Sequence, residues 1–198
     1  MLLDYLLDKF WLISTIGSVL LVLDMYLTIV GYRLSQEGYS EYFETEMYEM
    51  NPRYRDVIHN QTDLTIRDYI IRILIGTLPG LMVLVLNAPF IVNPEFLINL
   101  IIELVIGGFM LLYLMVNLNH LSNIFMFKYV RDNPNELSGT LKQSPSYSFV
   151  MTRRMYFQYL VIWCLVYILT SRIFFLGGVI ELVILILFTF LWERNQSK

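Results

Sequence analysis

Residues Phe10–Tyr32 read FWLISTIGSVLLVLDMYLTIVGY, an apolar run in which Asp24 is the only charged side chain. An α-helix rises ~1.5 Å per residue, so about 20 such residues cross the ~30 Å hydrocarbon core of a bilayer. The apolar residues are continuous here and are not confined to one helix face, as they would be in an amphipathic helix. The stretch therefore predicts a helix that spans a membrane.

The whole chain is similarly rich in apolar residues. Of its 198 residues 57% are hydrophobic and 16% are charged, whereas a soluble domain has roughly 25% charged residues. We predict an all-α fold, a polytopic membrane helical bundle of about five transmembrane helices that forms a single domain over residues 1–198. The predicted spans are 10–32, 69–92, 96–127, 155–171 and 174–192. The connection between the last two is so short that they could instead form one kinked or re-entrant unit, which would leave four spans.

Lysine and arginine set the expected orientation, because cytoplasmic loops are enriched in both. With five spans, the side that holds the N-terminus carries only Lys9 and Arg172. The opposite side carries Arg33, Arg53, Arg55, Arg67, Lys128, Arg131, Lys142, Arg153, Arg154, Arg194 and Lys198. We therefore expect the N-terminus outside, with the C-terminus and the long loops, 33–68 and 128–154, in the cytoplasm.

The predicted loops contain residues that are typical of turns and of helix starts. We expect one or two short interfacial helices in the polar, tyrosine-rich stretch 35–60 and a flexible loop at 133–146, which contains Pro134, Gly139 and Pro145. The sequence from Thr65 to Asp68 matches a capping box that would open the second span. Asn-Pro at 93–94 would open the third span after a tight turn.

Several classes of protein receive no support from the sequence. The formal net charge is −3 and no basic stripe with interleaved aromatic residues occurs, so we expect no nucleic-acid partner. Asp4 and Asp8 precede the first run, which is also too long for a cleavable signal peptide, so we expect it to remain as a membrane helix. Cys164 is the only cysteine, and we interpret it as a structural, reduced residue. The expected partners are the lipid bilayer and either further copies of the chain or subunits of a membrane complex.

Asp24 is the most informative polar residue because a charged group at bilayer depth is costly. Thr28 follows it by one helical turn, and Gly17 and Gly31 lie near the same face, so one stripe of this helix is small and polar. The carboxylate could accept hydrogen bonds from neighbouring helices. It could equally serve as a metal ligand, a proton carrier or a catalytic group.

His120 is the second candidate. Asn117 and Asn123 lie about one turn before and after it, so the three share a helix face at the depth expected for Asp24. A hydrogen-bonded packing residue and a ligand are both open interpretations of His120.

Two glutamates lie in the outer halves of the predicted spans. Glu103 is followed by two glycines and Glu181 is preceded by two, which favours close packing of these helices. Arg172, in the turn between the last two spans, could pair with either glutamate. The alternative is that both are uncharged in the bilayer.

The first cytoplasmic loop adds Glu46, Glu49, Asn51 and His59. These residues could form a solvated acidic helix that stops at Asn51. Alternatively Glu46 or Glu49 could reach the level of Asp24 and His120, and two carboxylates with an imidazole could bind a divalent metal that activates water. No cofactor is otherwise indicated.

The pattern Asp24-x-x-x-Thr28, followed by Glu49-x-Asn51-Pro52, resembles a group of small uncharacterised integral membrane proteins of archaea and bacteria. Those proteins have a first-helix Asp-x-x-x-Thr, a following Glu-x-Asn-Pro and an asparagine in a later helix, for which Asn117 is the candidate. The resemblance covers about a quarter of the chain. The chain departs from this group in two respects. Its loop between Thr28 and Glu49 is longer, and its second span has only Arg72 where a lysine would be expected. The resemblance implies membrane location and selects residues, but it supplies no activity.

Three hypotheses follow for the function. The first is a non-enzymatic membrane component, oligomeric or bound to a complex, with a polar ion or ligand site at the cytoplasmic side of the bilayer. The second is a metal-dependent intramembrane hydrolase or lipid-modifying enzyme that uses the same residues. The third is a purely structural subunit. The residues predicted to line the site are Asp24, Thr28, Glu49, Asn51, Asn117 and His120.

Overall fold

The structure of the protein, a computed structural model, describes residues 9–45, 65–86 and 95–196. Five long helices make up most of it: α2 (Phe10–Leu34), α5 (Ile66–Leu86), α6 (Glu95–Asp132), α7 (Pro145–Thr170) and α8 (Ile173–Gln196). The prediction of an all-α chain is confirmed.

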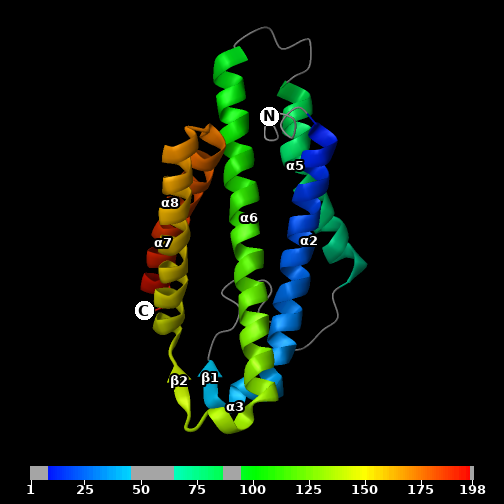
Figure 1. Cartoon of the computed structure of the whole chain (residues 1–198). Coiled ribbons are helices and arrows are strands. Elements are labelled where there is room, and N and C mark those ends of the chain that lie inside the picture. The colour runs from blue at the N-terminus through cyan, green and yellow to red at the C-terminus, as the bar shows by residue number, and fades with distance from the viewer. Residues whose placement is uncertain (1–8, 46–64, 87–94, 197–198) are drawn as a thin grey trace.

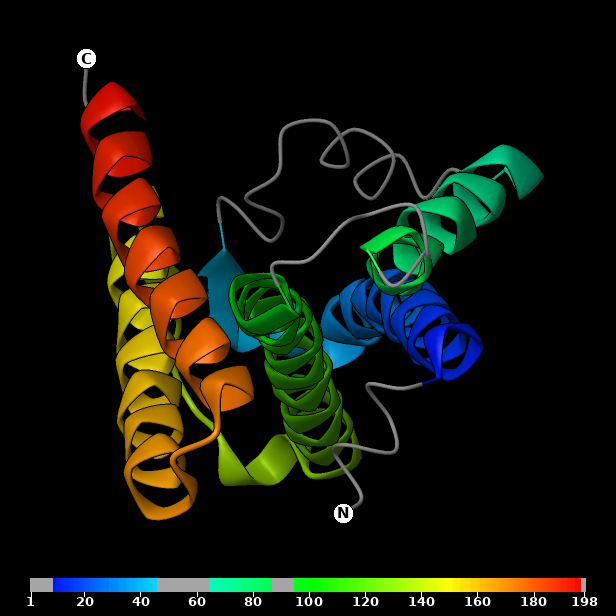
Figure 2. The same cartoon turned by 90° about the horizontal axis from the view of Figure 1, so that it is seen from above.

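The helices form a row in which α2, α6 and α8 run parallel, while α5 runs antiparallel to α2 and α7 runs antiparallel to α8 (Figures 1 and 2). The longest helix, α6, lies at the centre and packs against α2 on one side and α8 on the other. α5 packs along α2, and α7 packs along α8, so the order in space is α5, α2, α6, α8, α7. The two outer helices each contact mainly one neighbour.

Three of the helical segments are long and apolar enough to cross a membrane: Phe10–Tyr42, Leu100–Asp132 and Ile173–Arg194. The described part of α5 begins with Arg67, Asp68 and, one turn later, Arg72, whereas α7 carries Arg153 and Arg154 in its first half. These charges shorten the apolar part of both helices.

The helix starts obey local capping chemistry. The Asp68 carboxylate accepts hydrogen bonds from the Thr65 backbone N–H at 3.0 Å and from its hydroxyl at 2.7 Å, which supports the predicted capping box. α6 begins at Glu95, one residue before the predicted span, and Asn93 and Pro94, which were predicted to open it, lie outside the described residues.

α7 begins ten residues before the predicted span, at Pro145 and not at 155. The Ser144 hydroxyl accepts the Tyr147 N–H at 3.3 Å, and Pro145 occupies the first helical turn, where its missing N–H costs nothing. The apolar run starts only after Arg154, so hydropathy marks the apolar part of the helix and misses its polar first turns.

α7 and α8 are two separate helices. Between them Ser171 adopts the left-handed conformation (φ 53°), which ends α7, and α8 starts at Ile173. The two helices therefore do not form a single kinked helix.

The segment after α2 turns at Gly38 and continues to a short strand. α2 passes into a turn of π-helix, Ser35–Tyr39, and then into α3 (Ser40–Tyr42) and β1 (Phe43–Thr45). Gly38 has a φ of 146°, which a residue with a side chain rarely adopts. The rest of the stretch in which we predicted interfacial helices lies outside the described residues.

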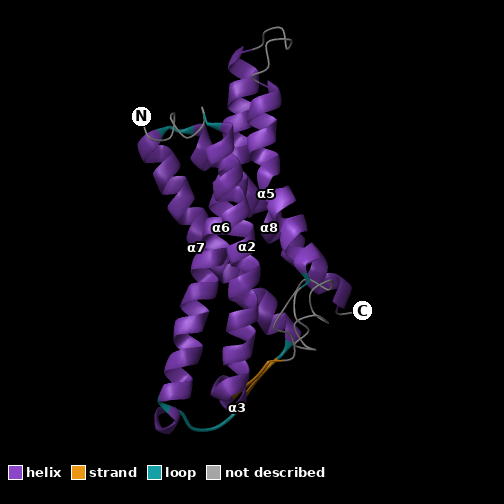
Figure 3. Ribbon diagram, turned by 90° about the vertical axis from the view of Figure 1, so that its right-hand side faces the viewer, coloured by secondary structure: helices purple, strands orange, loops and turns teal. Residues whose placement is uncertain are grey.

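Residues 133–146, predicted as a flexible loop, include two short regular elements. They contain a 3-10 turn, Pro134–Glu136, and β2 (Leu141–Gln143), which pairs in parallel with β1. The Tyr42 hydroxyl donates to the Pro134 carbonyl at 2.8 Å, so the two loops are joined at one end of the molecule, here called the strand end (Figure 3).

Glycines set the two closest helix crossings. A Cβ added at Gly177 would clash with the Leu104 carbonyl and lie 2.7 Å from the Gly108 nitrogen, so α6 and α8 meet backbone to backbone. Gly17 and Gly76 do the same for α2 and α5. Such small residues permit close approach between helices in lipid, where van der Waals contact and hydrogen bonds drive association.

We predict that Gly177→Ala destabilises the protein more than Gly178→Ala. The new methyl at 177 meets backbone atoms, which cannot move aside, and overpacking of this kind costs about 1–3 kcal/mol. At 178 the nearest atom is the flexible Leu111 Cδ1, 2.7 Å away. Thermal unfolding of both variants in the same detergent measures the difference, and equal midpoints would contradict the backbone crossing.

Candidate functional site

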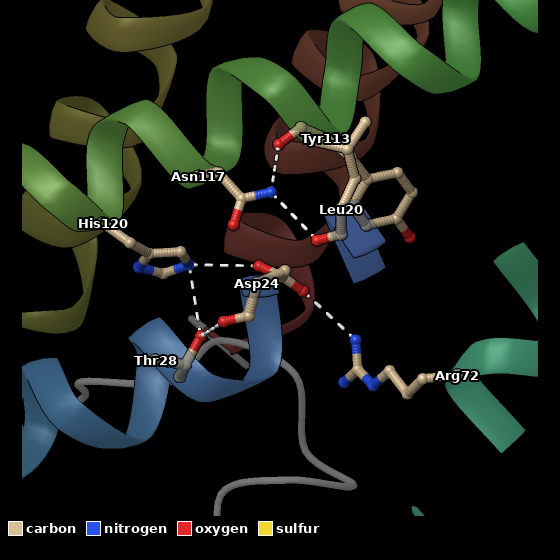
Figure 4. Close-up of polar contacts among 7 residues, drawn as sticks. All are labelled: Leu20, Asp24, Thr28, Arg72, Tyr113, Asn117 and His120. Atoms are coloured by element: carbon tan, nitrogen blue, oxygen red, sulfur yellow. Dashed lines mark hydrogen bonds and ion pairs between the residues drawn. The ribbon is translucent and has the colours of Figure 1, made fainter. Parts of the chain in front are cut away.

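The Asp24 carboxylate on α2 lies between two side chains from other helices (Figure 4). Arg72 Nη1 on α5 is 3.1 Å from Asp24 Oδ2, and His120 Nε2 on α6 is 3.3 Å from Asp24 Oδ1. One carboxylate thus joins α2, α5 and α6. We call Asp24, Thr28, Arg72, Asn117 and His120 the polar cluster.

Thr28 determines how His120 is oriented. The Thr28 hydroxyl donates to the Asp24 backbone carbonyl at 2.8 Å, and its oxygen lies 3.2 Å from His120 Nε2. Because the single hydroxyl hydrogen is used for the carbonyl, the Thr28 oxygen must accept from the ring. The pattern assigns the proton to Nε2 of His120, which then faces Thr28 and Asp24 together.

Asn117 connects the cluster to the backbone. Its side-chain Nδ2 donates to the Leu20 carbonyl on α2 at 3.0 Å and to the Tyr113 carbonyl at 2.7 Å. The residue is 3% exposed, and its Oδ1 has no hydrogen-bond partner among the described residues. Figure 4 shows this oxygen on the side of Asn117 that faces the contact between Asp24 and His120.

Helix geometry explains why these residues meet. Asp24 and Thr28 are four apart on α2, and Asn117 and His120 are three apart on α6, so each pair lies on one face. The crossing of Gly17 with Gly76 fixes α5 beside α2. Asp24 lies ~10 Å along α2 from Gly17, whereas Arg72 lies ~6 Å along the antiparallel α5 from Gly76, and the long arginine side chain covers the difference.

The charges in the cluster are largely removed from solvent. The side chains of Arg72, Asp24 and His120 are 14%, 15% and 20% exposed. Breaking a buried ion pair by removing one partner is strongly destabilising, because the remaining charge is left uncompensated. Removal of either the Asp24 carboxylate or the Arg72 guanidinium would therefore leave the other charge buried and unpaired.

Four residues predicted for the site lie together: Asp24, Thr28, Asn117 and His120. The others, Glu49 and Asn51, lie outside the described residues, as do Glu46 and His59. Sequence reasoning left Arg72 out of the site. The signal was present, because Arg72 is the one basic residue inside the predicted second span and Asp24 the one acidic residue inside the first.

The cluster is poorly suited to a divalent metal on its own. Asp24 and His120 are the two metal-ligand types that it brings together, and the described residues contain no group of three His, Cys, Asp or Glu side chains able to hold an ion. The Arg72 guanidinium occupies one carboxylate oxygen, and it repels a divalent cation about twice as strongly as a monovalent one. A metal at this site would therefore need further ligands. The other two that we proposed, Glu46 and Glu49, lie outside the described residues.

The outer-half glutamates do not form the predicted ion pair with Arg172. Glu103 Oε1 instead accepts the Phe174 backbone N–H, 3.3 Å away, at the first turn of α8. A carboxylate is favoured there because the first N–H groups of a helix lack partners within it. Glu181 lies beside Gly108 and, within the described ranges, makes no hydrogen bond or ion pair.

No protein-family model matches the chain, and neither the curated proteins nor the solved structures contain a match to it. The site therefore has to be interpreted from its own geometry.

We predict strong energetic coupling between Asp24 and Arg72. Asp24→Asn leaves the guanidinium without its carboxylate and should cost about 3 kcal/mol of unfolding free energy, whereas Asp24→Asn with Arg72→Gln should cost less than the sum of the two single changes. Unfolding in mixed detergent micelles measures the cycle.

The matched control is the exposed pair Arg131–Glu37, at 2.9 Å against 3.1 Å for Arg72–Asp24, whose side chains are 35% and 52% exposed. Its coupling should stay within about 1 kcal/mol, as for other surface ion pairs. Equal coupling in the two cycles would mean that the polar cluster is no more than a surface contact.

Proposed function

We propose that the protein is a multi-pass integral membrane protein with five spans and a non-enzymatic role, in which the polar cluster joins three spans and binds a small polar ligand near the cytoplasmic side. The observation that carries this proposal is the Asp24 carboxylate held between Arg72 and His120 from two other helices. It agrees with the first of the sequence hypotheses.

The packing of α5 and α7 supports five spans. α5 runs along α2, and α7 runs along α8, both of which have the length and composition of membrane spans. A bilayer around α2 and α8 would therefore surround their neighbours too. Arg72 satisfies its charge on Asp24, and Arg153 pairs with Glu193 at 2.6 Å near the strand end, so one arginine in each of these two helices is compensated.

The charge distribution supports a cytoplasmic strand end. The basic residues Arg33, Lys128, Arg131, Lys142 and Arg153 all lie toward the strand end, whereas Lys9 and Arg172 lie at the opposite ends of their helices. The positive-inside rule then places the N-terminus outside and the C-terminus in the cytoplasm.

We predict that cysteines at positions 9 and 142 are labelled from opposite sides of the membrane. Lys9→Cys should react with a membrane-impermeant maleimide from outside, and Lys142→Cys only after the membrane is opened, both in a Cys164→Ser background that removes the single native thiol. Labelling of both positions from the same side would overturn the proposed topology.

The free acceptor in the cluster supports a ligand site. A buried polar group without a partner costs about 1–3 kcal/mol, and Asn117 Oδ1 is such a group within the described structure. A small cation or hydrogen-bond donor placed between Asn117 Oδ1 and the nearer Asp24 oxygen would satisfy it.

The ligand site is tested by thermal unfolding of the purified protein in chloride salts of Na⁺, K⁺, NH₄⁺, Mg²⁺, Mn²⁺ and Zn²⁺ at equal ionic strength. A ligand at 100 times its Kd stabilises the folded state by about 2.7 kcal/mol, which raises the midpoint by several degrees for a chain of this size. We expect a monovalent ion to do so in the wild type and not in Asn117→Leu.

Asn119→Ala is the control, since it removes an amide from the same helix outside the cluster. If no salt stabilises the wild type more than Asn117→Leu, the cluster only joins helices and the ligand site is refuted. Stabilisation by a divalent ion alone, lost in Asp24→Asn and accompanied by metal in the purified protein, would instead favour the enzyme hypothesis.

A further inference from the structure

Two polar side chains of α7 and α8 have no partner within the chain as described. Gln158 is exposed on α7 and Glu181 is partly exposed on α8, and neither makes a hydrogen bond or an ion pair with any described residue. In water this would need no explanation. In the five-span arrangement proposed above, on which this inference rests, both side chains lie at bilayer depth, where an unsatisfied polar group is costly.

The contacts between α7 and α8 show that the two residues lie at nearly the same depth. The helices are antiparallel, with Arg153 paired to Glu193 and the Trp163 ring 6.2 Å from the Phe175 ring. Gln158 is midway between Arg153 and Trp163, so its level on α8 is midway between Glu193 and Phe175, at residue 184. Glu181 is three residues from that level, which is ~4.5 Å along the helix.

Gln158 points away from its own α8. Arg153 and Trp163 both contact α8, and each lies ~140° from Gln158 around the α7 helix, one on either side of the opposite face. Leu165 and Leu169, which share the face of Gln158, are exposed. This face of α7 is the outer edge of the helix row (Figure 2).

Glu181 lies on the other flank of α8, beside α6. Its Cβ is 3.6 Å from the position that a Cβ would take on Gly108. Gln158 and Glu181 therefore cannot meet within one chain, although they lie at one level. Two copies inserted in the same bilayer have the same orientation, so the levels of the two residues coincide between copies as well.

We propose that copies of this chain associate in the membrane through a hydrogen bond between Gln158 of one copy and Glu181 of the next. The glutamine amide supplies the N–H that the carboxyl group accepts, and each side chain thereby gains the partner that its own chain lacks. Because the two residues lie on different faces, the contact between copies is head-to-tail.

Association is measured by subunit counting through photobleaching of labelled protein in lipid bilayers, over a range of protein-to-lipid ratios. Gln158→Leu and Glu181→Leu should each raise the dissociation constant roughly 3- to 20-fold, the range known for hydrogen bonds between membrane helices. The exchanged variant, Gln158→Glu with Glu181→Gln, keeps one amide and one carboxyl at each contact and should recover most of the association.

Leu165→Ala serves as the control, since it changes the same α7 face without removing a polar group. A wild type that stays monomeric at every ratio, or leucine variants that associate as tightly as the wild type, would overturn the proposal. Labelling at positions 9 and 142 is repeated on each variant. Labelling of both positions from the same side would refute the five-span topology, whereas labelling from opposite sides without association would refute the contact alone.

Discussion

A carboxylate within an apolar helix must be compensated by another part of the chain, and Asp24 imposes this requirement on the structure. Its partners come from α5 and α6, which places both helices at a fixed height and rotation relative to α2. The interaction is directional, because Arg72 and His120 take different oxygens of the same group. In a bilayer, apolar packing alone would let helices slide past one another, since lipid and side chains would offer similar contacts. The polar cluster supplies the specificity that such packing lacks.

Close packing and the polar cluster depend on each other. Arg72 reaches Asp24 because Gly17 and Gly76 let α2 and α5 approach to backbone contact. Ser14 and Ser18 strengthen the same crossing by donating to the Thr77 and Ile73 carbonyls at 3.2 and 3.0 Å. The α6–α8 crossing has a comparable arrangement, in which glycines bring the helices together and Glu103 accepts the Phe174 N–H beside them. In both places one small-residue contact makes a polar contact geometrically possible.

The sequence was sufficient to predict the helices. It was much less informative about which helices and side chains contact one another. Long apolar runs predicted all five helices, and the capping residues Thr65 and Asp68 marked the start of α5 correctly. Hydropathy could not show that α7 begins at Pro145, because its first turns are polar. The convergence of Asp24, Thr28, Asn117 and His120 was anticipated from matching depth along two helices. Arg72 was missed because its depth depends on how α5 crosses α2, and the expected pairing of Arg172 with the outer glutamates failed because Glu103 takes a backbone N–H instead.

The parallel pairing of β1 with β2 has a consequence for the order in which the chain acquires its structure. Phe43 pairs with Leu141, and the residues between them include all of α5 and α6. A ribosome adds residues one at a time, so β1 must wait for both helices to be made before its partner exists. The contacts of α2 with α5 are complete in sequence much earlier, at Leu86. The strand pair can therefore form only after the two helices that supply Asp24 and Arg72 have been synthesised, and it can do so before α7 and α8 are complete.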